Sequence, residues 1–162
     1  MVRSFAAVSP AFISFIAGLP ATFVDTPKPT EQCVDGSGLS YEDSKVKLAG
    51  YSWVQGERAI QEQLARNGPA VAWFKVFDDF LHYKSGVYSP TSDKFLGNHI
   101  VKIVGYGVEN GKKYWLLQNS WTTAWGDKGY AKIERGVNAC DIEGLTYFAV
   151  LEKDTRDKAV AL

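Results

Sequence analysis

The dipeptide Asn110-Gly111 is the feature that most constrains how this 162-residue chain folds. Asn-Gly is a strong short-range signal for a two-residue β-turn, because both residues tolerate positive φ angles. The flanking residues 99–108 and 114–118 are rich in β-branched, aromatic and other apolar side chains, which predicts the two strands of a hairpin. We therefore expect an antiparallel pair of strands joined at this turn.

The expected hairpin relates His99 and Asn119, which lie ten residues on either side of Glu109. In an antiparallel pair, residues symmetric about the turn face each other on the same side, about 5 Å apart. A strict two-residue turn is centred between Asn110 and Gly111, one and a half residues after Glu109. It would place the side chains of His99 and Asn119 on opposite faces of the hairpin. An odd-length loop, or a bulge at Gly105 or Gly107, is therefore required for them to meet.

The rest of the chain predicts one helix and further strands. We expect a helix at residues 57–66, because Ile60 and Leu64 would lie on one face of it. Glu62 and Arg66 are spaced for an ion pair, and Asn67-Gly68-Pro69 would end the helix. The spacing of apolar residues and the local composition predict a buried strand at 70–77 and further strands at 130–134 and 147–151. The residues 25–40 are rich in turn-forming types and predict an irregular connector. One helix and about five strands indicate an α+β fold, dominated by an antiparallel, partly closed sheet.

His99 and Asn119 are the residue types of a catalytic base and its orienting partner. Histidine has an ordinary pKa near 6.5, so it can act as a base or as the cationic partner of a thiolate. Asparagine accepts the ring N–H without adding charge, and the nearby Trp121 would shield that hydrogen bond from water. A lone histidine on a strand is commonly a satisfied core residue, and we expect the other histidine, His82, to be a surface or packing residue. The motifs around His99 favour the catalytic role instead.

A series of motifs runs from Thr26 to Lys153 and covers roughly four fifths of the chain. Its members, in order, are Thr26-Pro27-Lys28, Asn67-Gly68-Pro69, Asp79-Phe80-Leu81, Tyr83-Lys84-Ser85-Gly86-Val87-Tyr88, Gly97-Asn98-His99, Gly105-Tyr106-Gly107-Val108-Glu109-Asn110-Gly111, Asn119-Ser120-Trp121, Trp125-Gly126-Asp127, Gly129-Tyr130, Arg135-Gly136, Asn138, Cys140 and Ile142-Glu143. This series resembles the C-terminal half of the papain-family cysteine peptidases, in particular the cathepsin B branch. The resemblance implies the barrel-like right-hand domain of the papain fold, without a counterpart of its N-terminal helical lobe.

The resemblance also divides the chain into three parts. Residues 26–153 correspond to the papain-like C-terminal peptidase domain, and residues 154–162 form a tail. Residues 1–25 are signal-like or non-homologous. They carry Arg3, then an apolar stretch and small residues, which is typical of a secretory signal. A mis-joined exon that replaces an authentic upstream half and a structural strand are the alternatives. A secretory signal would place the protein outside the cell or in the lysosome.

Neither cysteine fits the nucleophile of such a site. Cys33 precedes Val34 rather than a tryptophan, and it lies 66 residues before His99, where about 130–150 are expected. Cys140 lies downstream of both partners. The residues alone allow two free thiols or one bond between them; the resemblance makes Cys33 a half-cystine whose partner lies in the upstream lobe. We expect the chain to have no nucleophile of its own and to be inactive alone.

The resemblance assigns four residues to substrate binding. Trp73, Ile100 and Leu145 would line the pocket for the second residue before the cleaved bond, and Trp125 would form a wall on the leaving-group side. Trp73 and Ile100 replace alanines and would narrow the pocket, whereas Leu145 replaces the acidic residue with which cathepsin B accepts arginine. Asp141 replaces a glycine and adds a charge near the same wall.

Two functions from different classes remain open. The first is the His/Asn-bearing domain of a cathepsin B-like cysteine endopeptidase, present as a truncated product that acts on peptides with a separate N-terminal lobe. The alternative is a non-catalytic homologue that binds peptides or a cystatin-type inhibitor. An upstream in-frame glutamine followed by Cys-Trp would favour the first.

Charge and composition exclude other classes of partner. Eighteen basic and eighteen acidic residues are interspersed, so the formal charge is zero, and neither nucleic acid nor a membrane is an expected partner. Two cysteines do not make a metal site, and we expect no metal and no cofactor.

Overall fold

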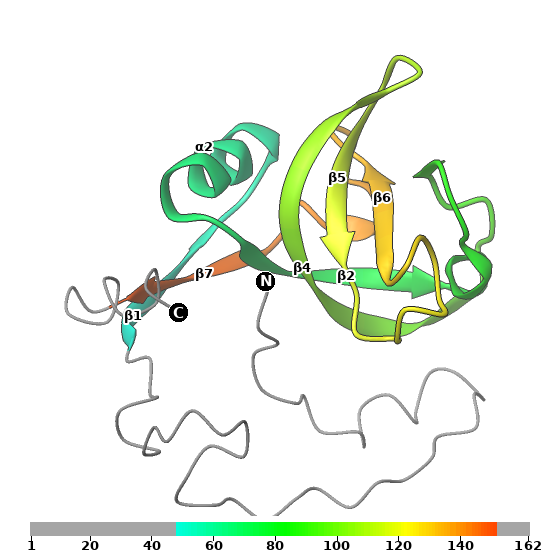
Figure 1. Ribbon diagram of the computed structural model, residues 1–162, viewed down its shortest axis with the longest axis horizontal. Helices are drawn as coiled ribbons and strands as arrows, with labels where there is room; N and C mark the ends of the chain where they lie inside the picture. Colours follow the sequence, from blue (N-terminus) through cyan, green and yellow to red (C-terminus); the bar gives the residue numbers. More distant parts are fainter. Residues whose placement is uncertain (1–47, 152–162) are drawn as a thin grey trace, which may run out of the picture. The chain divides into compact units, whose positions relative to one another are not determined.

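The computed structural model describes residues 48–151, in which one α-helix and two 3₁₀ helices accompany a seven-stranded sheet (Figure 1). The expectations for residues 1–25, the connector 25–40, Cys33 and the tail lie outside this range. The strands are β1 (Leu48–Val54), β2 (Ala70–Phe77), β3 (Val87–Tyr88), β4 (Phe95–Glu109), β5 (Lys112–Gln118), β6 (Tyr130–Glu134) and β7 (Thr146–Leu151). The helices are α2 (Glu57–Asn67), η2 (Asp78–His82) and η3 (Ala139–Asp141).

The sheet has the strand order β1-β7-β2-β4-β5-β6-β3. The pairs β2 with β4, β2 with β7, β4 with β5 and β5 with β6 are antiparallel, whereas β3 and β6 run parallel. Strand β4 has 15 residues and pairs with β2 through its first half and with β5 through its second. In Figure 1, β4 curves around β5 and β6, so the sheet curls on itself. The expected α+β class with one helix is confirmed for the described residues.

The hairpin has both the strict turn and the bulge. Glu109 pairs with Lys112 across a two-residue loop, whose Asn110 and Gly111 have φ angles of 49° and 81°. The register then shifts between Ile103 and Gly105, which leaves one extra residue in β4. This bulge shifts the pairing register of the preceding residues of β4 by one position. His99 and Asn119 therefore lie on the same face, for which the sequence required a bulge or an odd-length loop.

Strand β2 matches its expected bounds, but it is not buried on both faces. Its burial alternates: Ala72, Phe74 and Val76 are buried, whereas Val71 is 44% exposed. The expectation of a buried strand therefore holds for one face of β2 only. An apolar run suggested a strand covered on both sides, whereas an antiparallel sheet can be covered on one face alone.

Helix α2 begins at the expected residue and ends one residue later than expected. Gly68 terminates it with a φ of 83°, and its N–H donates to the carbonyl of Leu64 at 3.2 Å. The expected pair between Glu62 and Arg66 is not formed, because Glu62 accepts from Arg58 Nε at 2.9 Å. Both arginines are four residues away, but helical side chains lean toward the N-terminus, and this direction brings Glu62 to Arg58.

Candidate active site

His99, in the first half of β4, and Asn119, just after β5, are in direct contact. The distance from His99 Nε2 to Asn119 Oδ1 is 2.9 Å. The same oxygen accepts from the backbone N–H of Ser120 at 2.8 Å, and the N–H of Asn119 donates to the carbonyl of Gly129 at 2.9 Å. An amide oxygen can only accept, so Nε2 carries the proton and the lone pair of the neutral ring lies at Nδ1.

The imidazole is covered on one face by an indole. The rings of His99 and Trp121 are stacked, with centroids 4.9 Å apart and planes 25° from parallel, and Trp121 is only 6% exposed. Phe74, opposite His99 on β2, lies 5.9 Å away. Burial lowers the pKa of His99 below its ordinary 6.5, and the hydrogen bond to Asn119 opposes this effect without reversing it. The ring is therefore held as a neutral base near pH 7.

Trp125 packs against Trp121. The two indoles meet edge to face at 5.0 Å, and Trp125 donates from Nε1 to the carbonyl of Leu81 at 3.0 Å. Phe80, fully buried, lies 5.8 Å from Trp121 and 5.1 Å from Trp125. The chain turns sharply after Trp125 at Gly126, where a Cβ would lie 2.5 Å from the carbonyl oxygen of Tyr130. Trp125 is thus a packing partner of the site, 8% exposed.

A pocket of about 350 Å³ lies beside β2 and is lined by Trp73, Asp141, Gly144 and Leu145. Its two walls are joined, since the N–H of Trp73 donates to the carbonyl of Leu145 at 3.4 Å. Three of the four residues were singled out from the sequence; Gly144 was missed, because a residue without a side chain leaves no chemical signal. Ile100 and Trp125 do not line this pocket. Ile100 faces Trp73 across the β2–β4 pair and is 56% exposed.

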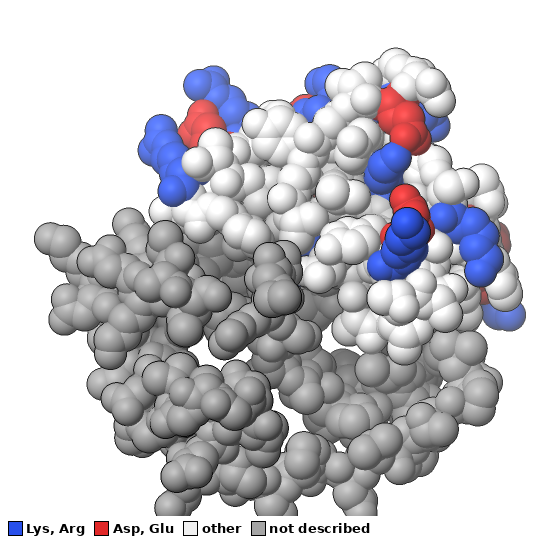
Figure 2. Space-filling model, in the orientation of Figure 1, with Lys and Arg blue, Asp and Glu red and all other residues white. Residues whose placement is uncertain are grey.

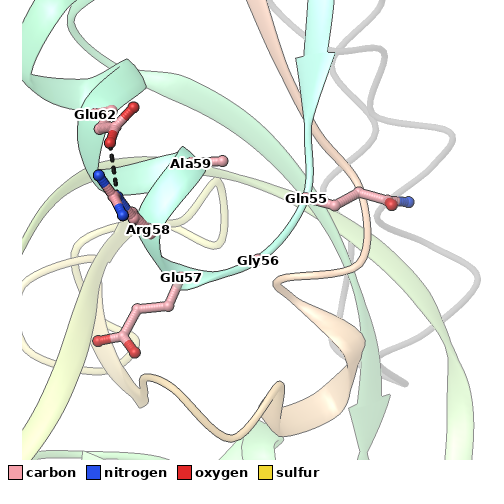
Figure 3. Close-up of a pocket in the computed structure, with 6 residues that line it drawn as sticks. All are labelled: Gln55, Gly56, Glu57, Arg58, Ala59 and Glu62. Carbon is pink, nitrogen blue, oxygen red and sulfur yellow. Dashed lines mark hydrogen bonds and ion pairs between the residues drawn. The ribbon is translucent and has the colours of Figure 1, made fainter.

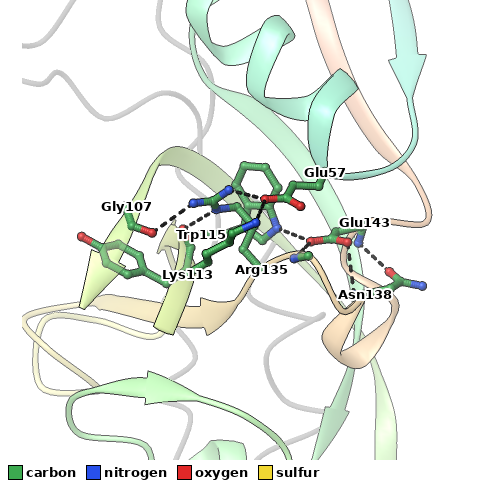
Figure 4. A network of polar contacts seen from close by, with 9 residues as sticks. Glu57, Gly107, Lys113, Trp115, Arg135, Asn138 and Glu143 are labelled. Carbon is green, nitrogen blue, oxygen red and sulfur yellow. Dashed lines mark hydrogen bonds and ion pairs between the residues drawn. The ribbon is translucent and has the colours of Figure 1, made fainter. Parts of the chain in front are cut away.

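The loop that carries Asp141 and Leu145 is tied down by a buried carboxylate (Figure 4). Glu143 is 6% exposed and accepts hydrogen bonds from Trp115 Nε1 at 2.9 Å, from the N–H of Gly136 at 2.6 Å and from the N–H of Asn138 at 3.1 Å. Such charge-assisted bonds are stronger than neutral ones, so they fix the loop against the barrel. The motif series contained Glu143, but nothing in its local sequence indicated that it is buried.

Arg135 extends this polar network. Its guanidinium pairs with Glu57 and donates to the carbonyl of Gly107 at 3.2 Å, and it lies over the rings of Tyr106 and Trp115 at 5.2 and 5.4 Å. A second hollow of about 550 Å³ at the start of α2 is lined by Gln55, Gly56, Glu57, Arg58, Ala59 and Glu62 (Figure 3). Its charged residues are engaged in ion pairs, and it contains none of the residues expected to act on a substrate.

Residues 48–151 were also compared with the requirements of a metal centre and of a membrane span. Within residues 48–151, no group of three or more histidine, cysteine, aspartate or glutamate residues is placed to hold a metal ion. No helix in the same range is both long and apolar enough to cross a bilayer. On the face shown in Figure 2, basic side chains lie beside acidic ones instead of forming a single patch.

Cys140, the cysteine that the structure describes, is a free thiol packed in the interior. Burial, with the negative charges of Asp79 and Asp141, raises its pKa to about 12. The thiol is therefore protonated at neutral pH, and the thiolate that attacks a carbonyl is scarce.

Comparison with known proteins shows that the chain belongs to the papain family of cysteine proteases. Residues 23–150 match the family described as papain family cysteine protease. The chain is 42% identical over 127 residues to cathepsin B-like cysteine proteinase 3 of Ostertagia ostertagi, which covers 78% of this chain and 73% of that protein. It is 47% identical over 114 residues to cathepsin B of Dictyostelium discoideum, which covers 70% of this chain and 37% of that protein.

A solved structure gives the same family. Procathepsin B S9 from Trypanosoma congolense superimposes with a TM-score of 0.70 at 40% sequence identity, over 82% of this chain and 45% of that one. The resemblance seen in the sequence is thereby confirmed, as is the cathepsin B-like character of the domain. The chain spans less than half the length of this structure and of the Dictyostelium relative.

Proposed function

We propose that this chain carries the histidine and asparagine of a cathepsin B-like cysteine endopeptidase. His99 is the base, Asn119 holds its tautomer, and Trp121 covers the bond between them. The observation that supports this most strongly is the 2.9 Å contact from Nε2 to Asn119, which leaves Nδ1 as the basic atom. A catalytic base needs this combination of a fixed ring, a free lone pair and a neutral resting form.

The chemistry follows from these roles. Nδ1 of His99 takes the proton of a cysteine thiol, and the thiolate attacks the carbonyl carbon of the peptide bond. The imidazolium then gives that proton to the leaving amine, and the remaining acyl-thioester is hydrolysed by water with the same ring as base. Proton transfer by a positioned histidine contributes about 10²–10⁴-fold in rate. Asn119 keeps the ring oriented through both steps.

The nucleophile has to come from outside the described domain. Cys140 is protonated and buried, and Cys33 lacks the following tryptophan and the spacing of the family. We therefore propose that an N-terminal lobe supplies the thiol. Removing the nucleophile of such a site costs on the order of 10⁶ in rate. Like other members of this branch, the protein would act on peptides in a lysosomal or secreted setting, with a cystatin-type inhibitor as a further partner.

The pocket lined by Trp73, Asp141, Gly144 and Leu145 supports an apolar substrate side chain. Its walls hold the indole of Trp73 and the aliphatic group of Leu145, and the carboxylate of Asp141 is paired with Lys75 at 2.6 Å. Neither Leu145 nor the paired Asp141 therefore offers a free counter-charge to a guanidinium. Burying an unpaired cation is costly, so small or aliphatic side chains are preferred over arginine at the second position before the cut.

The alternative function is a non-catalytic binding module for peptides or a protease inhibitor. The observation that favours it is that this pocket is formed entirely by residues of the described domain. In that case the chain would bind a cystatin-type inhibitor tightly while no partner restores hydrolysis.

Assaying the purified chain tests the assignment of the nucleophile. Fluorogenic dipeptide substrates in reducing buffer between about pH 5 and 7 should show no turnover, because neither cysteine is positioned to attack. Cys33→Ala and Cys140→Ala are the matched variants. Turnover that disappears in Cys33→Ala would contradict the proposal, whereas turnover that survives both substitutions would come from a contaminating thiol protease.

A further inference from the structure

One ion pair borders the substrate pocket. Of the four residues that line the pocket, only Asp141 is charged, and its Oδ2 lies 2.6 Å from Nζ of Lys75. Lys75 lies two residues after Trp73 on β2, so both side chains leave the strand on the same face. The side chains of Lys75 and Asp141 are each 44% exposed, so the pair is accessible from the solvent.

The carboxylate of Asp141 is held in place by its backbone as well as by this pair. Asp141 adopts a φ of 60°, in the left-handed region that aspartate and asparagine tolerate better than most residues. Its second oxygen, Oδ1, lies 3.4 Å from Nδ2 of Asn138. Asn138 also accepts from the N–H of Glu143 at 2.9 Å, which connects this wall to the buried Glu143 network. The position of the charge is thus fixed by the loop, and its neutralisation depends on Lys75.

We propose that Lys75 determines the specificity of this pocket by neutralising Asp141. With the pair formed, the pocket presents Trp73 and Leu145 and accepts an apolar side chain. Without the lysine, the pocket wall carries an unpaired carboxylate, and it accepts the cationic side chain of arginine or lysine. This inference rests on the proposed function, since it takes the pocket to bind a peptide side chain.

The size of the effect follows from the exposure of the pair. A half-exposed charge pair is screened by solvent and is weak. When the Lys75 ammonium is removed, the guanidinium of a bound arginine side chain can pair with Asp141 with similar strength. The guanidinium is also no longer repelled by the ammonium. We therefore expect a change of about fivefold in relative affinity, the order of magnitude that one such pair provides.

The test compares two small probes on the full chain. N-acetyl-L-leucine amide and N-acetyl-L-arginine amide are titrated while the backbone amide resonances of Gly144 and Leu145 are followed by NMR. Lys75→Met retains the apolar stem and removes the charge. The ratio of the arginine Kd to the leucine Kd should fall about fivefold in this variant.

Two further variants make the result specific. Lys75→Met combined with Asp141→Asn should restore the ratio of the unmodified chain, because asparagine keeps the left-handed backbone and removes the charge. Lys94→Met, whose ammonium lies 3.8 Å from Asp78 outside the pocket lining, should leave the ratio unchanged. An unchanged ratio in Lys75→Met would overturn the inference. So would a fall that persists in the double variant, or the absence of shifts with both probes in every variant. None of these results bears on hydrolysis by a reassembled enzyme, which tests the proposed function separately.

Discussion

Two opposing influences act on the ring of His99. Burial under Trp121 and beside Phe74 disfavours the charged imidazolium, whereas the hydrogen bond to Asn119 favours it, and burial dominates. The two neighbours of the histidine thus have separate functions. Asn119 selects the tautomer, and Trp121 provides low-polarity surroundings that favour the neutral ring; in the proposed mechanism this ring then takes the proton of a thiol.

Removing the side chain of Asn119 and removing that of Trp121 should move the pKa of His99 in opposite directions. Asn119→Ala removes the bond that favours the cation, so the pKa should fall further below 6.5. Trp121→Ala admits water to the ring, so the pKa should rise. An NMR pH titration of the His99 ring protons measures both, with His82→Ala as the background that leaves a single histidine signal. Shifts in the same direction in both variants would contradict this account of the site.

At the scale of elements, the position of the pair depends on the turn and bulge of the β4–β5 hairpin. The two-residue turn alone places His99 and Asn119 on opposite faces, and the single extra residue between Ile103 and Gly105 brings them onto the same face. A change that weakens the turn should therefore cost stability while leaving the local arrangement of the site intact, because the bulge lies between them.

Gly111→Ala tests the contribution of the turn. The φ angle of 81° at this position disfavours any residue with a Cβ, so the substitution should lower the free energy of unfolding by about 1–2 kcal/mol. Gly50→Ala is the matched control, because Gly50 lies in β1 with open space around it and without a positive φ; it should change stability by less than about 0.5 kcal/mol. Urea unfolding measures both. Equal losses in the two variants would argue against a strained turn.

Local patterns explain which elements the sequence could predict. The hairpin, α2, β2 and β6 have turn signals, caps or apolar runs of their own, and they lie within a few residues of where the sequence placed them. Strand β1 is exposed over most of its length and β3 has two residues, so neither has a periodic pattern. The site was predictable where motifs carry it, at His99 and Asn119. The pairing of Lys75 with Asp141 and the burial of Glu143 arise from contacts between distant segments, which a sequence pattern does not encode.

In the molecule as a whole, residues 48–151 provide the hydrogen-bonded pair of His99 and Asn119 and a pocket, but no exposed thiol. The relatives that share its family are longer than the matched region, by more than twofold in the Dictyostelium cathepsin B. We therefore propose that two lobes complement each other, and that His99 acts on a cysteine that the other lobe supplies.

Refolding the two lobes together tests whether they complement each other. The chain is refolded together with the N-terminal lobe of a cathepsin B-like proteinase that retains its cysteine, and hydrolysis of a fluorogenic dipeptide is measured. Reconstituted samples made with the unmodified chain and with His82→Ala should both turn over substrate, whereas His99→Ala should lose activity by about 10²–10⁴-fold, because the thiol then has no base. Equal turnover with His99→Ala and the unmodified chain would contradict the account.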